Sequence, residues 1–305
     1  MVLIVGSGGL LGAHAAAYFR RLGSPVVCAS HRLDADLQVD LTQPDDGFVT
    51  RLPAGVTHAL IASSMTSIDA CARDPETTRR FNVTHTIQLL EALLARDIQP
   101  IFCSSDLVFK GDRGHYREDD PREPTTEYGR HKLAVEAFLL GQDRPCLIIR
   151  MSKLYSLDPD DPSPIGQMLT ALLRGESIRC ADDQVICPTA VEDIPRALDG
   201  LLRQRATGVY HVAAPQRFTR YTVGRRVAAA VGRETLVRRC ALRDFAFAEP
   251  RPVDTSLDVN KFITETGFRF TALQESLPEI LRRRHAHASA ASGGGPLADV
   301  KEVLR

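Results

Sequence analysis

The sequence of 305 residues has no tryptophan and no net charge, because 38 Lys and Arg residues are balanced by 38 Asp and Glu residues. Without an excess of positive charge, nothing favours nucleic acid or an anionic membrane surface as a partner. No apolar run is long enough to cross a bilayer. The start of the chain also lacks a basic stretch followed by an apolar one, so we expect no signal peptide.

Metal-binding patterns are also missing. The seven cysteines include no Cys-x-x-Cys pair, so we predict no metal site. Several of them, such as Cys28 and Cys103, stand in apolar runs, which is typical of buried, reduced thiols. Reduced cysteines favour a cytoplasmic protein.

What the sequence does have is a regular alternation of short apolar runs with amphipathic segments. The apolar runs predict strands and the amphipathic segments predict helices. Strands that alternate with helices favour a parallel sheet covered on both faces, so we predict a doubly wound α/β fold. The predicted strands cover residues 2–5, 25–30, 59–62, 100–104, 146–149 and 207–212, and the predicted helices cover residues 10–22, 75–95, 126–140, 162–173, 221–231 and 273–284.

A glycine-rich turn joins the first predicted strand to the first predicted helix. Gly6, Gly9 and Gly12 have the spacing Gly-x-x-Gly-x-x-Gly. Such glycines permit a tight turn and let the backbone approach a pyrophosphate, while the helix N-terminus offers N–H groups to phosphate. An ordinary glycine loop is the alternative. The strand–turn–helix context favours a dinucleotide site that comprises Gly6, Ser7, Gly9, Leu10, Leu11 and Gly12.

The end of the second predicted strand bears on the choice of cofactor. His31 and Arg32 stand there, and a basic residue at this position suits the 2′-phosphate of NADP. We therefore favour NADP(H), with Arg32 as the main contact, while two nearby aspartates keep NAD(H) open. Asp40, which precedes Leu41, either lies near the adenine or caps the next helix.

Candidate catalytic residues stand at the end of the predicted strand 100–104 and in the predicted helix 126–140. Ser104 and Ser105 end a predicted strand, where ligands bind in open α/β sheets, and a hydroxyl there can steady a developing oxyanion. Ser105 is the first choice, and capping of the turn is the alternative role for both serines. Tyr128 and Lys132 are four residues apart on a predicted helix and so share one face. Because the Lys132 ammonium is expected to lower the pKa of Tyr128, the pair indicates hydride transfer to or from a carbonyl, with tyrosine handling the proton.

These segments resemble those of the extended short-chain dehydrogenase/reductases, and in particular the dTDP-4-dehydrorhamnose reductase-like, sugar-nucleotide-binding family. The resemblance extends over residues 1–284. One departure stands out, because Lys153 occupies the position at which the family usually has a tryptophan that faces the sugar. Besides the glycine turn, the resemblance is carried by Phe81-Asn82-Val83 and by residues 104–111, 116–121, 128–136, 188–194 and 251–258.

The resemblance implies a Rossmann-type sheet with a smaller C-terminal α/β substrate-binding cap. We predict an NAD(P)-binding domain over residues 1–150 and the cap over residues 151–284, with residues 182–215 returning to the first domain. Residues 285–305 are predicted to be a flexible tail, because residues 285–295 are rich in Ala, Ser, His and Gly. The last ten residues are either a short helix or disordered.

The family's reaction is the NADPH-dependent reduction of the 4-keto group of a nucleotide-linked deoxysugar, so the resemblance implies an NAD(P)H-dependent oxidoreductase. Tyr128 is then the proton donor, Ser105 polarises the ketone, and Lys132 holds the nicotinamide ribose. Further implied contacts are those of the cofactor with Ala62, Ser63 and Ser64, and those of the substrate with Ser104, Asp106, Met151, Lys153 and Arg251.

Two other functions stay open on the same scaffold. One branch that resembles this family is a non-catalytic, NADP-binding regulatory subunit of methionine adenosyltransferase, and it keeps the Tyr-x-x-x-Lys pattern. A sugar-nucleotide epimerase would hold NAD tightly through its cycle. The expected partner is a small nucleotide-sugar substrate, and a homodimer is compatible with the habits of the superfamily.

Overall fold

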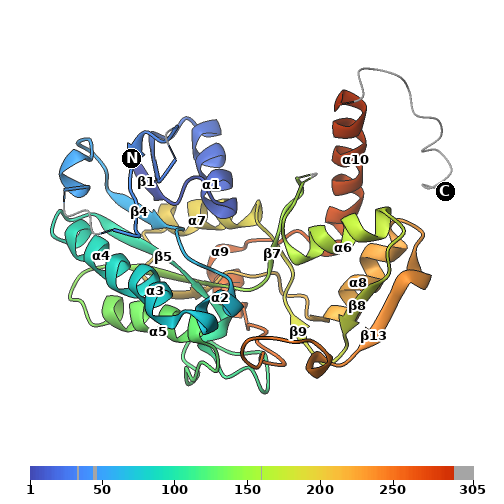
Figure 1. Cartoon of the computed structure of the whole chain (residues 1–305). Helices are drawn as coiled ribbons and strands as arrows, with labels where there is room; N and C mark the ends of the chain where they lie inside the picture. Colours follow the sequence, from blue (N-terminus) through green and yellow to red (C-terminus); the bar gives the residue numbers. More distant parts are fainter. Residues whose placement is uncertain (33, 44–46, 159, 292–305) are drawn as a thin grey trace.

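The central element of the computed structural model, which describes residues 1–291 except residues 33, 44–46 and 159, is a sheet of seven parallel strands (Figure 1). The strand order is β11-β6-β5-β4-β1-β2-β3. This order confirms the predicted doubly wound α/β fold class. The strands are β1 (Val2–Val5), β2 (Val26–Ser30), β3 (Leu37–Gln38), β4 (His58–Ile61), β5 (Gln99–Ser105), β6 (Leu147–Met151) and β11 (Gly208–His211).

Helices cover both faces of this sheet. Successive residues of a strand point to opposite faces, so Ile4 packs in one hydrophobic core and Leu3 packs in the other. Burial on both sides explains why β1 is apolar throughout rather than alternating. The first face is covered by α1 (Leu10–Arg21) and α7 (Asp193–Arg203), and the second by α4 (Thr86–Leu94) and α5 (Glu127–Leu140).

The strand order reverses at β1, which lies between β2 and β4. In open α/β sheets, ligands bind at such a switch point, outside the carboxyl ends of the strands. The chain leaves β1 at Gly6 and leaves β4 at Ala62. The fold therefore sets the glycine turn beside residues 62–64, at the edge of the sheet where a ligand is expected.

The predicted helix over residues 75–95 is interrupted in the structure. A π-helical segment, Arg80–His85, separates α3 (Pro75–Arg79) from α4. Within it, the Asn82 side chain accepts a 2.8 Å hydrogen bond from the backbone nitrogen of Met65 and donates one of 3.0 Å to its carbonyl. Met65 belongs to the loop before α2 (Ile68–Arg73), so this is a tertiary contact. The apolar periodicity continues unchanged through residues 80–85, and the sequence pattern therefore gave no sign of the interruption.

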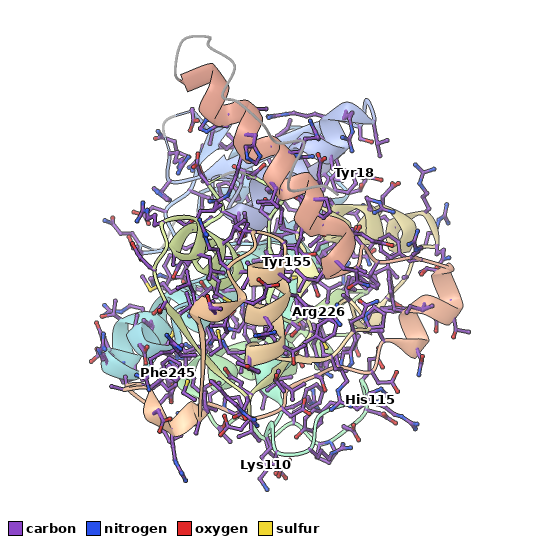
Figure 2. The ribbon with its side chains drawn as sticks, turned by 90° about the vertical axis from the view of Figure 1, so that its right-hand side faces the viewer. Tyr18, Lys110, His115, Tyr155, Arg226 and Phe245 are labelled. Carbon is purple, nitrogen blue, oxygen red and sulfur yellow. The ribbon has the colours of Figure 1, made fainter. Side chains whose placement is uncertain are left out.

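A second layer, the cap, lies beside the carboxyl end of the sheet (Figure 1). Tyr155 is fully buried in its core, with its hydroxyl 2.7 Å from that of Ser276. Figure 2 views the molecule from the cap side, with Lys110 and His115 at the edge away from the C-terminal helix. The cap contains α6 (Pro164–Leu173), α8 (Arg220–Ala229), α10 (Leu273–Ala291), and the strand pairs β7 (Leu154–Tyr155) with β10 (Thr189–Ala190), β8 (Ile178–Ala181) with β13 (Val237–Cys240), and β9 (Val185–Ile186) with β12 (Phe218–Thr219).

Parts of the second half of the chain contact the sheet layer. β11 pairs with β6, and α7 packs beside α1. Phe262 of α9 (Asn260–Thr266) and Phe270 join the same core as Ile4. The division of the chain into an NAD(P)-binding domain and a substrate-binding cap at residue 150 stays a prediction.

The sequence prediction for residues 285–291 is wrong. α10 continues to Ala291, where a flexible segment was expected from residue 285. Alanine favours helix, and the Nδ1 atom of His285 lies 2.7 Å from the carbonyl of Leu281, one turn earlier. The predicted tail over residues 292–305 lies outside the described residues. Like the other helices of the described ranges, α10 is not long and apolar enough to cross a membrane.

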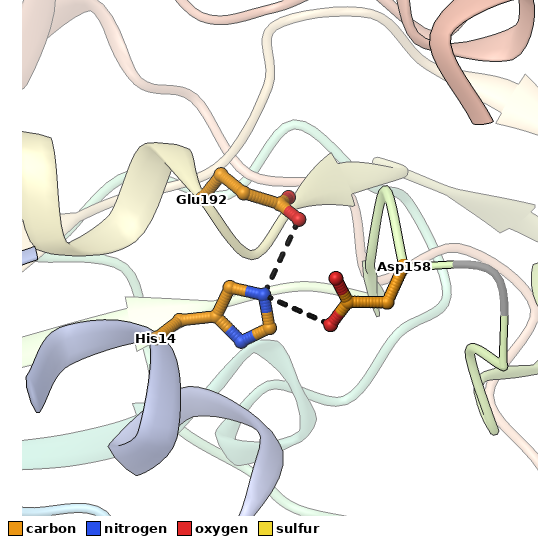
Figure 3. A group of neighbouring side chains, drawn as sticks. All are labelled: His14, Asp158 and Glu192. Carbon is orange, nitrogen blue, oxygen red and sulfur yellow. Dashed lines mark ion pairs between the residues drawn. The ribbon is translucent and has the colours of Figure 1, made fainter. Parts of the chain in front are cut away.

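Three titratable side chains connect α1 to the cap (Figure 3). The Nε2 atom of His14 lies 3.3 Å from Oε1 of Glu192 and 3.4 Å from Oδ2 of Asp158. The hydrogen bond with Glu192 is the main reason why the pKa of His14 is raised above 6.5. All three side chains are of metal-ligating types. The prediction of no metal site rested on ligand residues close together in sequence. His14, Asp158 and Glu192 are far apart in sequence, so that criterion could not detect this group.

His14→Gln is expected to destabilise the protein more at acidic than at alkaline pH. A raised pKa means that the folded state binds the His14 proton more tightly than the unfolded state does. The stabilisation is therefore complete below pH 6.5 and is lost as the pH rises through the folded-state pKa. The loss of unfolding free energy, measured by urea denaturation, should be larger at about pH 5.5 than at about pH 8.5.

His58→Gln is the matched control for this variant. Burial lowers the pKa of His58, so the difference between variant and wild type should change with pH in the opposite direction. An equal loss of stability at both pH values in His14→Gln would contradict the role given to the two carboxylates.

Candidate active site

Two of the predicted glycines have no room for a side chain. Gly6 has a φ of +88°, and a Cβ atom on it would lie 2.6 Å from the backbone nitrogen of Ser63. A Cβ atom on Gly12 would lie 2.1 Å from the carbonyl oxygen of Gly6. The turn after β1 thus packs directly against the loop after β4 and against α1, as a dinucleotide site of the Rossmann type requires.

A cavity of about 460 Å³ opens beside this turn. Arg32 lies over the turn, since a Cβ atom on Gly8 would come within 2.9 Å of its Cδ. Asp40 lines the cavity and also accepts a 2.8 Å hydrogen bond from the backbone nitrogen of Thr42, which lowers the pKa of its carboxyl. The lining includes the predicted cofactor residues Gly6, Gly9, His31, Arg32, Asp40, Leu41, Ala62, Ser63 and Ser64.

A second cavity, of about 490 Å³, adjoins the first. Both are lined by Gly9, Ala62 and Ser64, and Pro164 of α6 brings the cap to the wall of the second. The result is an extended hollow that runs from Arg32 to the cap. The lining of the second cavity includes the predicted residues Leu10, Leu11, Ser104, Ser105, Asp106, Tyr128, Lys132, Met151 and Lys153.

The helix α5 brings Tyr128 and Lys132 to one wall of the second cavity. Thr126 precedes the helix, and its hydroxyl accepts a 3.1 Å hydrogen bond from the backbone nitrogen of Gly129. The Lys132 ammonium lies 5.5 Å from the centre of the Tyr128 ring and donates a 2.8 Å hydrogen bond to the carbonyl of Cys103. Both side chains are buried.

The expectation that Lys132 leaves Tyr128 with a lowered pKa is wrong for this structure. Burial raises the pKa of Tyr128 above its usual range, and a hydrogen bond with Ser64 opposes that shift only in part. Burial also lowers the pKa of Lys132 to about 8. Lys132 does not lower the pKa of Tyr128 here, because its ammonium is directed to the Cys103 carbonyl rather than to the phenol oxygen. Tyr128 is therefore held as a neutral phenol, which carries a proton that it can donate.

Ser105 lies where its predicted catalytic role requires it and also caps the turn that follows β5. Its hydroxyl lines the second cavity and also accepts a 3.2 Å hydrogen bond from the backbone nitrogen of Leu107. It donates at 2.9 Å to Asp106, which in turn accepts hydrogen bonds from Ser152 at 3.0 Å and Thr255 at 2.7 Å. Burial raises the pKa of the Asp106 carboxyl. Three hydroxyl groups thus fix this carboxyl beside the serine.

Some predicted residues have other partners. Ser104 lines the second cavity and donates a hydrogen bond to Glu136 of α5. Ser7 and Gly12 line neither cavity and serve the packing of the turn. Arg251 also lines neither cavity, because its guanidinium pairs with Asp69 of α2 at 2.7 Å. Its charge still acts on Lys153 of the second cavity, so Arg251 lies near the site without lining it.

Asn82 is a positioning residue that sequence reasoning missed. Its side-chain oxygen accepts hydrogen bonds from the Ser64 hydroxyl at 3.1 Å and from the backbone nitrogen of Met65. It thereby fixes the loop that both cavities share, and its neighbour Phe81 lines the first cavity. The segment Phe81-Asn82-Val83 was part of the family resemblance, and that signal could have pointed to this role.

Gly129→Ala is expected to destabilise the protein by about 1–3 kcal/mol and to lower any activity of the site, because overpacked atoms must move. A Cβ atom on Gly129 would lie 2.1 Å from the carbonyl oxygen of Leu107, so α5 would be displaced at Tyr128. Urea denaturation and activity assays measure the two effects. Gly200→Ala, at a helical position in α7 with open space around it, is the control and should be neutral or stabilising. Equal behaviour of both variants would contradict the close packing at Gly129.

The class of the protein follows from the sheet, the glycine turn at its switch point and the cavity beside them: it is a Rossmann-type α/β protein with a dinucleotide site. Residues 1–285 match the model of the family described as RmlD substrate binding domain. Because this match covers most of the chain, the protein belongs to the RmlD substrate binding domain family.

Several relatives over most of the chain are named reductases. "Probable low-salt glycan biosynthesis reductase Agl14" of Haloferax volcanii is 28% identical, over 91% of this chain and 96% of its own length. A dTDP-4-dehydrorhamnose reductase of Mycolicibacterium smegmatis is 29% identical, over 84% of this chain and 77% of its own length. A relative with another name, methionine adenosyltransferase 2 subunit beta of Mus musculus, is 24% identical, over 93% of this chain and 89% of its own length.

Solved structures share the whole fold. The dTDP-4-dehydrorhamnose reductase of Bacillus anthracis, in complex with NADP, superposes with a TM-score of 0.82 over 92% of this chain and 98% of its own, at 20% identity. This likeness confirms the predicted Rossmann-type sheet. The names of two of these relatives, both reductases, agree with the predicted oxidoreductase class.

Proposed function

We propose that this chain uses NADPH to reduce the 4-keto group of a nucleotide-linked deoxysugar. The observation that carries the proposal is the lining of one cavity by Ser105, Tyr128 and Lys132, directly beside the cavity at the glycine turn. The names of two relatives support the type of reaction. The first cavity is the proposed place of the adenosine half of the cofactor, and the second receives the nicotinamide and the ketone.

The residues present fit a dinucleotide. Gly6, Gly9 and Gly12 have no side chain at the turn, which lets a pyrophosphate approach their backbone. Gly9 precedes α1 without a capping side chain, so the first N–H groups of the helix are available to phosphate oxygens. NADPH supplies the hydride when it is bound.

Each residue then has a defined part in the reduction. When the ketone is bound, the Ser105 hydroxyl turns its single proton from Asp106 to the ketone oxygen and stabilises the negative charge that develops there. Tyr128, held neutral by burial, transfers its proton to that oxygen, so the product is an alcohol and the tyrosine becomes a phenolate. Lys132 holds the nicotinamide ribose, and solvent returns the proton to the Tyr128 phenolate after the transfer.

NADPH oxidation against a panel of dTDP-, UDP- and GDP-linked 4-keto sugars tests this proposal. We expect turnover with at least one member of the panel and reduction at C4 of its sugar. Tight binding of NADPH without oxidation in the presence of any of these sugars would contradict the proposed reaction.

Arg32→Ser is expected to lower kcat/KM for NADPH by about 10–100-fold, as the loss of a charge-assisted hydrogen bond does. Arg32 lines the first cavity and lies over Gly8, where it can reach a 2′-phosphate. NADH lacks that phosphate, so kcat/KM for NADH should be unchanged. The ratio of the two values, measured at equal substrate concentration, is the test. Equal losses with both cofactors would place the phosphate contact elsewhere.

A second candidate function is a non-catalytic, NADP-binding regulatory subunit. The relative named methionine adenosyltransferase 2 subunit beta favours it, because that similarity also covers most of the chain. Co-purification of a stable partner enzyme, together with the absence of NADPH oxidation across the panel, would support this function over the first.

We also propose a cytoplasmic location. All seven cysteines are unpaired, and all except Cys240 are buried. Unpaired thiols are typical of proteins in a reducing compartment.

A further inference from the structure

Two positively charged side chains meet where the second cavity reaches the cap. Lys153, which directly precedes β7, lines that cavity, and together with Arg220, the first residue of α8, it lines a small hollow behind it. The rest of this hollow is apolar, with Ile165, Met168 and Val223 in its wall. Charges in such surroundings are unfavourable unless something of opposite charge joins them.

The opposite charge that acts on Lys153 is the carboxyl of Asp106, and it acts without direct contact. Over the part of the chain that the structure describes, its ammonium makes no hydrogen bond and no ion pair. Asp106 is the acidic group that faces it, but the oxygens of that carboxyl already accept hydrogen bonds from Ser105, Ser152 and Thr255. Burial and the nearby positive charges lower the pKa of Lys153, and Asp106 only opposes that shift.

Arg220 is in the same situation. The hydrogen bond that its guanidinium makes is a 3.4 Å contact with the neutral side chain of Gln184, and among the described residues no carboxylate pairs with it. Two other arginines differ, because buried Arg150 pairs with Glu136 and half-buried Arg251 pairs with Asp69. Two unpaired cations at one end of a substrate cavity are thus a specific feature of this place.

We propose that Lys153 and Arg220 form an anion-binding subsite, and that the substrate is one whose carboxylate or phosphate oxygens reach it. This inference rests on the proposed function for the position of the reacting ketone, beside Ser105 in the same cavity. Ammonium and guanidinium groups bind carboxylate and phosphate oxygens through charge-assisted hydrogen bonds, which are stronger where water is excluded. The oxyanion comes either from a carboxylate on the sugar or from the diphosphate of the nucleotide.

Binding of three probes to the NADPH-loaded protein tests the subsite. UDP-glucose and UDP-glucuronic acid share base and diphosphate and differ by one carboxylate, and inorganic pyrophosphate has neither sugar nor base. Calorimetric titration of wild type, Lys153→Met and Arg220→Met gives the affinities. Both variants should lose about tenfold or more in affinity for the anion that they hold. Lys153→Arg, which keeps the charge, should retain most of it.

The pattern of losses identifies the anion. A loss restricted to UDP-glucuronic acid assigns the subsite to a sugar carboxylate, whereas equal losses for all three probes assign it to the diphosphate. Wild-type protein that binds none of the probes, or variants that bind them as wild type does, would overturn the inference. Melting temperature and NADPH affinity should be unchanged or higher in Lys153→Met, because a half-buried charge without an ion-pair contact is removed.

Failure of the inference can be told apart from failure of the proposed function. If the variants lose probe binding but wild type oxidises no NADPH with any 4-keto sugar, the subsite stands and the reaction does not. If wild type reduces such a sugar and the two variants keep its KM, the reaction stands and the subsite is excluded.

Discussion

Tyr128→Phe is expected to lower kcat by roughly 10²–10⁴-fold, the range found when a general acid is removed. The variant lacks only the hydroxyl that gives its proton to the ketone oxygen. The ring remains packed against Cys71, Leu107 and Ile68, so folding should be preserved. NADPH affinity should change little, because Lys132 and the glycine turn are untouched. Steady-state NADPH oxidation measures the first effect, and fluorescence titration with NADPH measures the second.

Tyr18→Phe provides the matched control. It also removes one phenol hydroxyl, here from a tyrosine of α1. The Tyr18 hydroxyl lies 3.4 Å from Asp199, and Tyr18 lines neither of the two cavities. Turnover should stay close to that of wild type. Near-normal kcat in Tyr128→Phe, with the control behaving as expected, would contradict the proton-donor role.

Arg150→Met is expected to destabilise the protein by about 3–5 kcal/mol, as the removal of one partner of a buried ion pair does. Arg150 is 1% exposed, and Glu136 is fully buried. The guanidinium donates to both carboxylate oxygens of Glu136, at 2.9 and 2.8 Å, and to the carbonyl of Glu118 at 2.9 Å. Among the described residues, the Glu136 carboxylate would keep only Arg122 as an ion-pair partner, at 3.7 Å. Because Glu136 lies one turn after Lys132 and also accepts the Ser104 hydrogen bond, this poorly compensated charge would disturb α5 where α5 meets β5 and β6. Urea denaturation gives the change in the free energy of unfolding.

Two further variants separate the charge effect from the loss of packing. In Arg150→Met combined with Glu136→Leu, no buried charge is left unpaired, so much of the stability should return. Arg203→Met removes an exposed partner of Asp199 and should change stability by less than about 1 kcal/mol. If Arg150→Met were as harmless as Arg203→Met, the structural role of the buried pair would be wrong.

The fold was predictable where short-range patterns determine it. The apolar run of β1, the glycines after it and the helix beyond are all local signals, and the repeated alternation implies a parallel sheet. Two errors arose where other contacts override the pattern. The side chain of Asn82 bonds to Met65 within a π-helical segment that interrupts the expected helix, and α10 runs through a composition that was read as a linker.

The candidate site was predictable to the extent that its members are neighbours in sequence. The spacing of Tyr128 and Lys132 places both side chains in one cavity, and the glycine turn lines the adjoining one. The direction of the Tyr128 pKa could not be predicted, because burial, which decides it, depends on how the whole chain packs. The pairing of Arg251 with Asp69 likewise joins segments far apart in sequence, and no local pattern reveals it.

A crystal structure of the protein with NADPH bound tests the central claim most directly, namely that the two adjoining cavities form one site for hydride transfer. The account predicts the adenosine phosphate beside Arg32, the pyrophosphate at Gly9, and the nicotinamide in the second cavity with its ribose hydroxyls at Lys132. The hydroxyl of Tyr128 should then face the space next to the nicotinamide C4 atom. A nicotinamide outside that cavity, or a cofactor bound in the reverse direction, would contradict it.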